Sequence, residues 1–306
     1  MKVASLRSKF VGCMVGCAVG DAFGASFHLS KKAKLIFRGK WTDDTHMMLG
    51  VAESIIACKG LNEEHMIWSF IRNWKKEPWR GYGPGPQRIF RMIISGVSWK
   101  KVAGTLYGGT GSFGNGAAMR VAPIGLFYYD NVEELRRVAC KSAMLTHTHP
   151  LGIEGAVIQA YAVATALKTR REDLDPKDFL ENIENFTVEN IYRKKLRLGR
   201  SLLEENDRKV IIRALGNSVE SFNSVPTAIY SFAKNIESYI KAVIFAASLG
   251  GDTDTICAMT GAISGAHHGE NGILKAWSQK LEKIEYITRL AEKLWKLKFD
   301  IQNANI

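Results

Sequence analysis

The chain has 306 residues, of which 46% are hydrophobic, 10% aromatic and 24% charged. This composition indicates a globular protein with enough apolar area for a large buried core. The formal net charge of +12 favours an anionic partner, but no nucleic-acid-binding motif accompanies it, so a nucleic acid ligand is not supported.

The chain is expected to form one domain over residues 1–306, because it has only seven prolines, no Ser/Gly linker and no internal repeat. Five scattered cysteines without a Cys-x-x-Cys pair argue against a disulfide framework and against a structural zinc site. This usage fits a reducing compartment, and we expect a cytoplasmic protein. The cysteines are Cys13, Cys17, Cys58, Cys140 and Cys257.

The first element is the apolar segment KFVGCMVGCAVGDAFGAS (Lys9–Ser26), which follows basic residues as a signal peptide does. Asp21 and four glycines interrupt it, so a signal peptide is rejected. Uncharged apolar stretches elsewhere fall well short of the roughly 20 residues of a membrane span, so no transmembrane helix is expected. The next run, Lys31–Lys40, has five basic and no acidic residues and is a candidate for steering a phosphate-bearing substrate.

The first carboxylate motif is WTDDTHMM (Trp41–Met48). Thr42, Asp43 and Asp44 stand where a helix begins near His46, and Asp and Thr are preferred residues for capping a helix start. Capping and metal binding are about equally good explanations of this motif alone.

Helical periodicity of apolar residues dominates the chain, and alternating strand patterns are nearly absent, so an all-α fold is expected. Glycine- and alanine-rich stretches fit helices that pack closely, at 12–25, 114–122 and 260–266. The periodic segments are Leu49–Cys58, Met66–Trp74, Val132–Met144, Gly152–Leu167, Pro176–Ile183, Ile191–Glu204, Tyr239–Leu249 and Lys275–Trp295.

Two glycine-rich loops lie between these helices. GYGPGP (Gly81–Pro86) is expected to be a rigid loop at a rim or lid. GGTGSFGNGAAMR (Gly108–Arg120) matches G-x-G-x-x-G literally, but no strand precedes it, which excludes a dinucleotide-binding fold. Closely spaced glycines still let backbone N–H groups approach phosphate oxygens, although for this loop taken alone a plain tight turn between helices is the better explanation.

Two further motifs follow. THTHP (Thr146–Pro150) precedes a helix expected near Leu151; His147 is favoured only modestly as a ligand contact, and a surface turn is the alternative. The basic run Ile191–Arg200 is interpreted as a solvated face. His267 and His268 are expected to cap a helix end.

The second carboxylate motif is SLGGDTDT (Ser248–Thr255), in one of the most apolar parts of the chain. Asp252 and Asp254 would diverge by about 200° within a regular helix, so they are expected on a turn or at a helix start. Together the two motifs supply four carboxylates and several hydroxyls, the oxygen ligands that a pair of hard divalent ions needs.

Taken in order, these motifs resemble those of the ADP-ribosylglycohydrolase family over about Phe10 to Gly269. The resemblance rests on GCMVGCAVGDAFGASF, WTDDT, GYGPGP, GSFGNGAAMRVAPIG, THTHP and SLGGDTDT. It implies a compact, single-domain, orthogonal multi-helix bundle with a binuclear magnesium centre in a central cleft. Mn²⁺ is the alternative ion.

The resemblance also implies roles for individual residues. The metal-ligand positions are Thr42, Asp43, Asp44, Asp252, Asp254 and Thr255. The positions that bind substrate are Gly111, Ser112, Phe113 and Asn115 in the loop, with Tyr107 or Phe113 stacking on adenine and His147 contacting the nucleotide. Where many members of the family have a glutamate, this chain has His28, which bears on the metal surroundings and on the proton acceptor.

The expected activity is hydrolysis of the glycosidic bond between ADP-ribose and a modified protein side chain or a related conjugate. Asp44, and after it Asp43, is the expected proton acceptor. Two alternatives stay open: a non-catalytic ADP-ribose-binding protein, and a metal-dependent phosphoesterase that cuts the diphosphate. The expected partner is an ADP-ribosylated protein or small conjugate, bound by a monomer.

Overall fold

The computed structural model describes residues 4–29, 37–170 and 172–304. Sixteen α-helices lie within these residues, and no strand does; a single isolated bridge pairs Gly114 with Glu220. The all-α prediction is therefore confirmed. The helices are α1 Leu6–Leu29, α2 Asp43–Cys58, α3 Glu63–Lys76, α4 Pro84–Ile94, α5 Trp99–Val102, α6 Ala122–Phe127, α7 Val132–Met144, α8 Pro150–Lys168, α9 Pro176–Phe186, α10 Asn190–Ser201, α11 Arg208–Leu215, α12 Ser221–Lys234, α13 Tyr239–Ser248, α14 Thr253–His268, α15 Lys275–Lys280 and α16 Ile284–Ala304.

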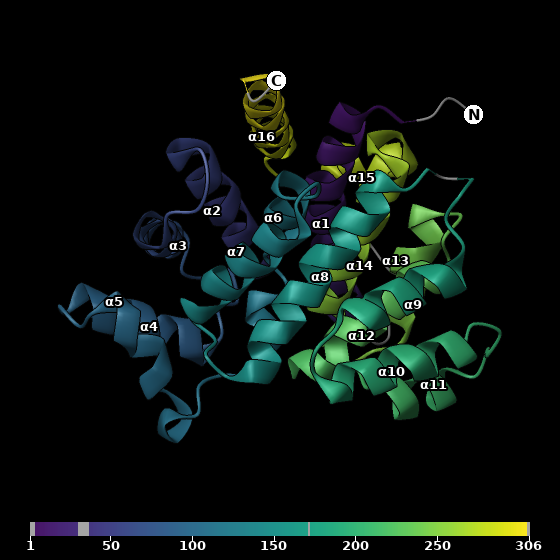
Figure 1. Cartoon of the computed structure of the whole chain (residues 1–306), viewed down its shortest axis with the longest axis horizontal. Helices are drawn as coiled ribbons and strands as arrows, with labels where there is room; N and C mark the ends of the chain where they lie inside the picture. The colour runs from purple at the N-terminus through teal and green to yellow at the C-terminus, as the bar shows by residue number, and fades with distance from the viewer. Residues whose placement is uncertain (1–3, 30–36, 171, 305–306) are drawn as a thin grey trace.

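Helices α1 and α14 pack against each other along most of their length at the centre of the fold (Figure 1). Their backbones approach so closely that a Cβ atom added to Gly20 would lie 2.1 Å from the carbonyl oxygen of Cys257. The same holds at Gly16, where an added Cβ would lie 2.5 Å from the carbonyl oxygen of Gly261. Only glycine fits at such contacts, which explains the glycines spaced four residues apart in the first apolar segment.

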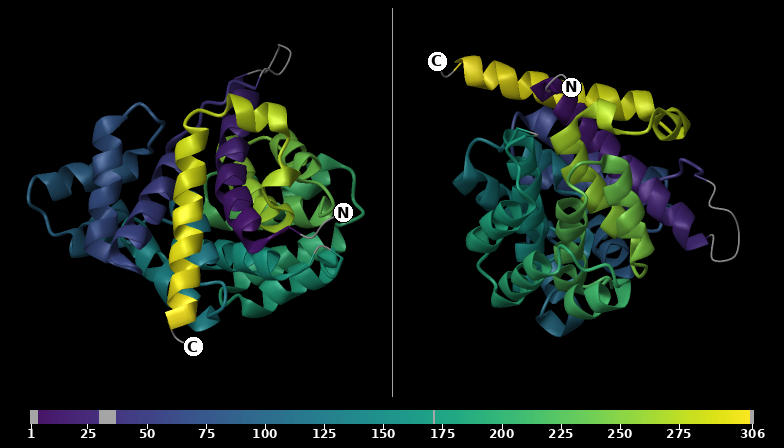
Figure 2. Two further views of the ribbon diagram at one scale, coloured as in Figure 1. Left: turned by 90° about the horizontal axis from the view of Figure 1, so that it is seen from above. Right: turned by 90° about the vertical axis from the view of Figure 1, so that its right-hand side faces the viewer.

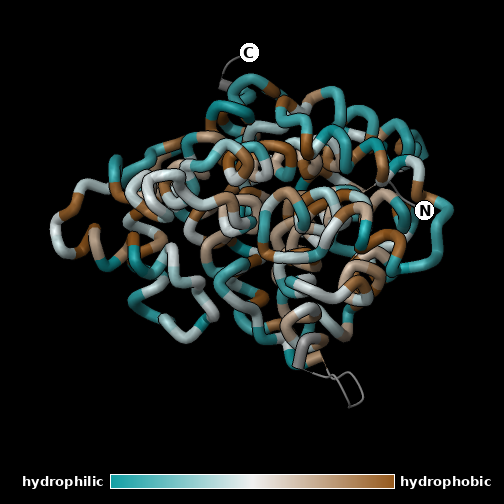
Figure 3. The backbone as a smooth tube through the Cα atoms, turned by 90° about the horizontal axis from the view of Figure 1, so that it is seen from below, coloured by the Kyte–Doolittle hydropathy of each residue, from teal (hydrophilic) through white to brown (hydrophobic). Residues whose placement is uncertain are grey.

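The remaining helices surround this central pair. Figure 1 shows α2–α5 on one side and α9–α13 on the other, with α8 in front of the central pair. Figure 2 shows α16 as a long helix that crosses the top of the molecule beside α1. Figure 3 shows short hydrophobic and hydrophilic stretches following one another along many surface helices. This pattern is expected of amphipathic helices that cover a core.

Helices α1 and α8 are long and apolar enough to cross a membrane by length and composition alone. In this fold 89% of the most apolar window of α1 and 78% of that of α8 is buried among other helices. Both are thus core helices here, a position that accounts for their apolar composition.

Two predicted helices differ from the structure. The stretch 114–122 is not a helix: a short 3₁₀ turn at Asn115–Ala117 is followed by an irregular segment, and α6 begins only at Ala122, with Pro123 in its first turn. The predicted helix Lys275–Trp295 is two helices, α15 and α16, separated where Lys283 adopts a left-handed conformation with φ of 55°. Apolar periodicity continues across such a break and so does not reveal it.

Some helices were not predicted. The loop 81–86 was expected to be irregular throughout, but Pro84 already begins α4, because proline is well suited to the first turn of a helix. Helix α12 contains Pro226 and many polar residues, which conceal its pattern.

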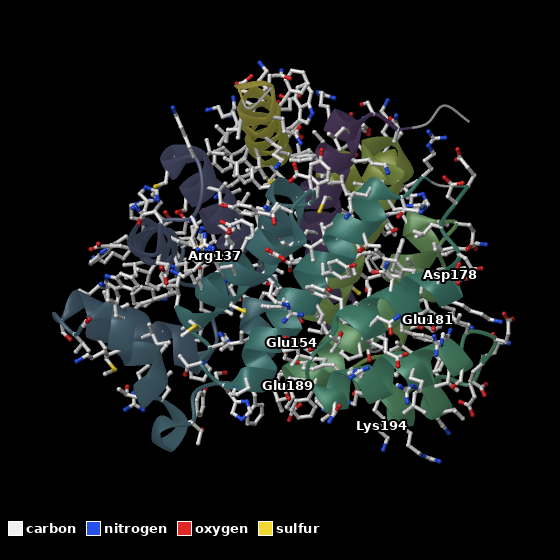
Figure 4. The ribbon with its side chains drawn as sticks, in the orientation of Figure 1. Arg137, Glu154, Asp178, Glu181, Glu189 and Lys194 are labelled. Carbon is white, nitrogen blue, oxygen red and sulfur yellow. The ribbon has the colours of Figure 1, made fainter. Side chains whose placement is uncertain are left out.

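The two basic runs have different outcomes. Most of Lys31–Lys40 lies outside the described residues. In the second run, α10 buries Tyr192 and Leu196 and exposes Lys194 and Arg197, the latter paired with Glu184 at 2.7 Å, whereas Lys195 donates to the carbonyl oxygen of Leu215. Figure 4 labels Glu181 and Lys194 on these neighbouring helices, and Glu181 pairs with Arg200 at 2.9 Å. The interpretation as a solvated face holds for Lys194 and Arg197 but not for Lys195.

Candidate functional site

The first carboxylate motif lies at the start of α2, against α1. Thr42 is the N-cap of α2, as the sequence predicts, and its Oγ1 accepts a hydrogen bond from the Asp44 backbone N–H. Asp21 of α1 accepts bonds from the backbone N–H groups of Thr42 at 2.9 Å and Thr45 at 3.1 Å, and from the Thr45 hydroxyl at 2.6 Å. Asp21 therefore fixes the start of α2 on α1.

Asp21 is a site residue that the sequence did not reveal. It is completely buried and lies one residue after Gly20, whose contact with Cys257 presses α1 onto α14. The available signal was a lone aspartate inside an apolar, glycine-rich helix, since such a placement requires hydrogen bonds or a counter-charge.

The second carboxylate motif lies at the start of α14, which confirms that Asp252 and Asp254 do not share a regular helix interior. Gly250 and Gly251 have φ of 70° and 71°, and this turn places Asp252 at the N-cap. A Cβ on Gly251 would lie 2.0 Å from the carbonyl oxygen of Asn217, so this turn requires glycine. The Asp252 side chain does not cap its helix and instead accepts a bond from Asn115 Nδ2 at 2.6 Å.

The carboxylates of the two motifs face one another and Asp21. The pKa of Asp21 and of Asp252 is raised to about 7, mainly by burial and also by the neighbouring charge of Asp254. Burial also raises the pKa of Asp43 and Asp44 well above the usual range, and for both the next causes are Asp21 and Asp254. No lysine or arginine is among the groups that shift these four pKa values. Among the described residues, the site is therefore a concentration of negative charge whose named electrostatic neighbours are other carboxylates.

The donor set suits a hard divalent cation. Asp44 Oδ1 is buried without a hydrogen-bond partner, and a carboxylate oxygen in that position is compensated by a metal ion. All the donors are carboxylate or hydroxyl oxygens; among them Thr255 is buried, and its hydroxyl lowers the pKa of Asp252 by donating to it. As the described side chains stand, however, no three His, Cys, Asp or Glu residues form a group that could hold an ion, so the binuclear centre stays a prediction.

The glycine-rich loop adjoins the carboxylates. A Cβ on Gly111 would lie 2.0 Å from Thr148 Oγ1, so the loop packs tightly on the THTHP segment. Ser112 Oγ accepts a bond from the Gly114 N–H at 3.1 Å. The contact between Asn115 and Asp252 then joins the loop to the start of α14. The absence of any strand before this loop within the described residues agrees with the exclusion of a dinucleotide-binding fold.

His147 lies beneath the loop and is buried. Its Nδ1 lies 2.7 Å from Thr146 Oγ1, and a Cβ on Gly116 would lie 3.0 Å from its ring. Burial, and after it the cation of Arg120, lowers the pKa of His147 to about 3, so the ring is neutral at physiological pH. His149 differs, because its Nδ1 caps α8 by accepting a bond from the Leu151 N–H.

Two exposed aromatic side chains border the loop. Phe113 is 43% exposed and lies edge-on to His149, and Tyr107 is 57% exposed. A Cβ on Gly85 would lie 3.0 Å from the Tyr107 hydroxyl, while one on Gly81 would lie 3.5 Å from Asp43 Oδ1. The segment 81–86 thus runs from the carboxylates to Tyr107 and lies at the rim of the site.

Two predicted positions fall elsewhere. His267 and His268 close α14 at the end opposite the carboxylates, where both are buried. The side chain of His28 lies outside the described residues.

The chain is similar to known proteins along most of its length. The family model described as ADP-ribosylglycohydrolase matches residues 2–303. The chain is 36% identical to ADP-ribosylhydrolase ARH3 of Homo sapiens over 283 residues, which cover 83% of this chain and 78% of that protein. It is 26% identical to ADP-ribosylarginine hydrolase Tri1 of Serratia proteamaculans, over 84% of this chain and 67% of that protein.

The fold also has a solved counterpart. A chain of an "ADP-ribosylglycohydrolase-related protein complex" superposes with a TM-score of 0.77 at 24% identity, over 96% of this chain and 99% of that one. The chain belongs to the ADP-ribosylglycohydrolase family and, with that family, is a hydrolase of glycosidic bonds to ADP-ribose.

Proposed function

We propose that this protein is a Mg²⁺-dependent hydrolase that cleaves the N- or O-glycosidic bond between ADP-ribose and a modified protein side chain or a related conjugate. The reaction releases ADP-ribose. The observation that carries the proposal is the cluster of carboxylates from α1, α2 and α14, joined to a glycine-rich loop by the 2.6 Å bond from Asn115 to Asp252. The names of the similar proteins, ADP-ribosylhydrolase and ADP-ribosylarginine hydrolase, support the same substrate class.

In this proposal the carboxylates hold two Mg²⁺ ions, with Mn²⁺ as a substitute. The ligands are Thr42, Asp43, Asp44, Asp252, Asp254 and Thr255. Bound divalent ions supply Lewis acidity, which orients the ribose hydroxyls and lowers the pKa of a water molecule. Their charge also offsets the mutual repulsion that raises the pKa of Asp43 and Asp44.

The loop binds the rest of the substrate. The segment Gly111, Ser112 and Phe113 receives the diphosphate, with the backbone N–H groups of Ser112 and Phe113 as donors, because that of Gly111 donates to the carbonyl oxygen of Leu106. Phe113 or Tyr107 stacks on the adenine, and neutral His147 contacts the nucleotide. Asn115 keeps this loop in register with the carboxylates through its bond to Asp252. The diphosphate and the anomeric carbon are thereby held in a fixed relation.

Asp44 is the proposed general base. Its Oδ1 has no protein partner and is the oxygen left for a metal ion, so Oδ2, which accepts a bond from the Thr42 hydroxyl, is the oxygen that would take the proton. Asp44 takes the proton of a water molecule while the water oxygen bonds to the anomeric carbon, and the bond to the acceptor breaks. The acceptor atom takes up a proton as it leaves, which balances the proton that Asp44 received from the water and then gives up. Asp43 is the second candidate for the base.

The test is a panel of ADP-ribosyl conjugates of arginine, serine, a polymer and a small ester. Each is incubated with the wild type, Asp252→Ala and the control Glu237→Gln, which lies on the far end of the molecule and pairs with Lys241. Free ADP-ribose should appear with the wild type and the control, disappear in EDTA and return with Mg²⁺. AMP as the product would indicate a phosphoesterase, and binding without release would indicate a binding protein. Undiminished release by Asp252→Ala would contradict the assigned role.

A further inference from the structure

Arg120 is a buried cation that the proposed mechanism leaves unused. It lies between the glycine-rich loop and α6 and has no exposed surface. Nη1 donates to the carbonyl oxygen of Gly116 at 3.2 Å and Nη2 to that of Ser142 at 2.8 Å, and the guanidinium lies 4.7 Å from the centre of the Phe70 ring. Its Nε is buried without a hydrogen-bond partner.

No carboxylate compensates this charge. Every Asp and Glu of the chain lies within the described residues, and none has an oxygen within 4.0 Å of the Arg120 guanidinium. Arg80 is a useful contrast, since its side chain is 8% exposed and pairs with both Glu77 and Glu282. Burial lowers the pKa of Arg120 to about 9, so it still carries its charge at neutral pH. A buried charge without an ion partner is expensive, and two carbonyl groups and a ring offset only part of that cost.

Arg120 faces the loop that lies above it. Its Nη1 bonds the carbonyl of Gly116, inside the 3₁₀ turn that carries Asn115. Its charge also acts on His147: after burial, the Arg120 cation is the second cause of the lowered pKa of that histidine. Gly116 therefore joins the three parts: its carbonyl oxygen accepts from Arg120, and a Cβ added to it would lie 3.0 Å from the His147 ring, in the part of the molecule where the loop is proposed to receive a diphosphate.

We propose that Arg120 is a positioning residue for the diphosphate of the substrate: its buried positive charge attracts the phosphates through the loop, and its bond to Gly116 holds that loop in place. Arg120 does not touch the substrate. This inference rests on the proposed function, because it takes the loop at 111–115 as the place of the diphosphate. According to this inference, the site prefers anionic ligands because of the charge of Arg120, although this side chain is buried.

The test compares a charged ligand with an uncharged one. Dissociation constants for ADP-ribose and for adenosine are measured in Mg²⁺ with the wild type, Arg120→Met, which removes the charge, and Arg120→Lys, which keeps it. We expect Arg120→Met to weaken ADP-ribose binding about tenfold, from the loss of one charge near a diphosphate. Adenosine binding should stay within about twofold of the wild type, because adenosine carries no phosphate charge. Arg120→Lys should retain most of the ADP-ribose affinity.

A second readout separates charge from structure. The pKa of His147, followed by NMR of the ring, should rise in Arg120→Met because the neighbouring cation is gone. Steady-state kinetics should show a raised KM with kcat largely kept. If Arg120→Met does not fold, Arg120→Gln removes the same charge and keeps a donor for Gly116.

The outcomes are distinct. Unchanged ADP-ribose affinity in a folded charge-removing variant, or an equal loss of ADP-ribose and adenosine binding, would overturn the inference while leaving the proposed function intact. A wild type that binds no ADP-ribose would overturn the proposed function, and the inference with it.

Discussion

The two ends of the α1–α14 pair differ in whether their buried charged groups have partners within the protein. At one end Asp21, Asp252 and Asp254 meet the start of α2, and no cationic side chain is among the groups that shift the pKa of Asp21 or Asp252. At the other end described charges have protein partners: Lys9 Nζ donates to the carbonyl oxygens of Leu167 and Thr169 at 2.8 and 3.0 Å. Arg7 at that end pairs with Glu270 and Glu292.

This difference indicates that the carboxylate end is a ligand site, whereas the far end only holds helices together. The far end contains a cavity of about 700 Å³ lined by Lys9, Glu237 and other residues, and there Lys9 bonds two backbone carbonyl groups while Glu237 pairs with Lys241. The carboxylate end instead leaves Asp44 Oδ1 without a partner. Buried charge that has no partner within the protein marks a place where a ligand supplies the partner. Whether the buried charges are paired therefore distinguishes the two ends better than the presence of a cavity does.

The largest difference between the ends is expected in activity. Asp254→Asn removes a carboxylate from the proposed metal site, and we expect release of ADP-ribose to fall by about 10²–10³. Glu270→Gln, the matched change at the far end, should keep activity near that of the wild type. Initial rates on one ADP-ribosyl substrate decide this, and comparable losses in both variants would remove the distinction.

The next prediction concerns stability, through the glycine contacts at which α1 and α14 pack against each other. Gly20→Ala places a Cβ 2.1 Å from the carbonyl oxygen of Cys257, and we expect a loss of about 3 kcal/mol in the free energy of unfolding, as for a severely overpacked core. Gly104→Ala, where an added Cβ meets nothing within 4 Å, is the control and should change stability by less than about 0.5 kcal/mol. Urea denaturation measures both. A tolerated Gly20→Ala would show that the two helices can move apart.

Divalent ions should stabilise the carboxylate end alone. Mg²⁺ at a hundred times its dissociation constant stabilises a folded protein by about 2.7 kcal/mol if it binds only that state. We therefore expect a Tm that rises by a few degrees on addition of Mg²⁺ to EDTA-treated protein. The rise should vanish in Asp252→Asn and persist in Glu237→Gln. Calorimetry without any shift in the wild type would contradict the metal site.

The last prediction concerns acid, which acts on buried histidines near the site rather than on one end of the pair. The pKa of His147 is lowered to about 3 and that of His46 to about 4, both mainly by burial. A lowered histidine pKa means that the unfolded chain binds protons first, so this stability is present above pH 6.5 and is lost as the pH falls towards 4. For each histidine the free energy of unfolding should fall by up to about 1.4 kcal/mol per pH unit.

The acid effect is measured by denaturation at a series of pH values with Mg²⁺ present, because Asp21 and Asp252 act in the opposite direction. Their raised pKa, about 7, makes their contribution in metal-free protein fall as the pH rises through 7. His147→Asn should flatten the acid slope, and an unchanged slope would show that His147 is not the group that titrates.

Much of the fold and part of the site were predictable. The segment Val132–Met144 coincides with α7, because a strongly amphipathic helix with Asn131 as its cap carries its own start and period. The capping of α2 by Thr42 and the position of Asp252 at a helix start followed from local spacing in the same way. The irregular segment after Gly114 did not, since small residues pack equally well in a helix and in a loop against His147.

The sequence by itself determined the helical class, the two carboxylate motifs and the glycine-rich loop, because caps, periods and turns depend on neighbouring residues. Only the tertiary structure decided that Asp21 supports the start of α2, that Asn115 joins the loop to Asp252, and that Arg120 is buried without a carboxylate. Each of these facts depends on residues far apart in the chain, brought together by the close approach of α1 and α14 and by the helices packed around them. Burial and charge compensation arise only from that packing, so no local pattern encodes them.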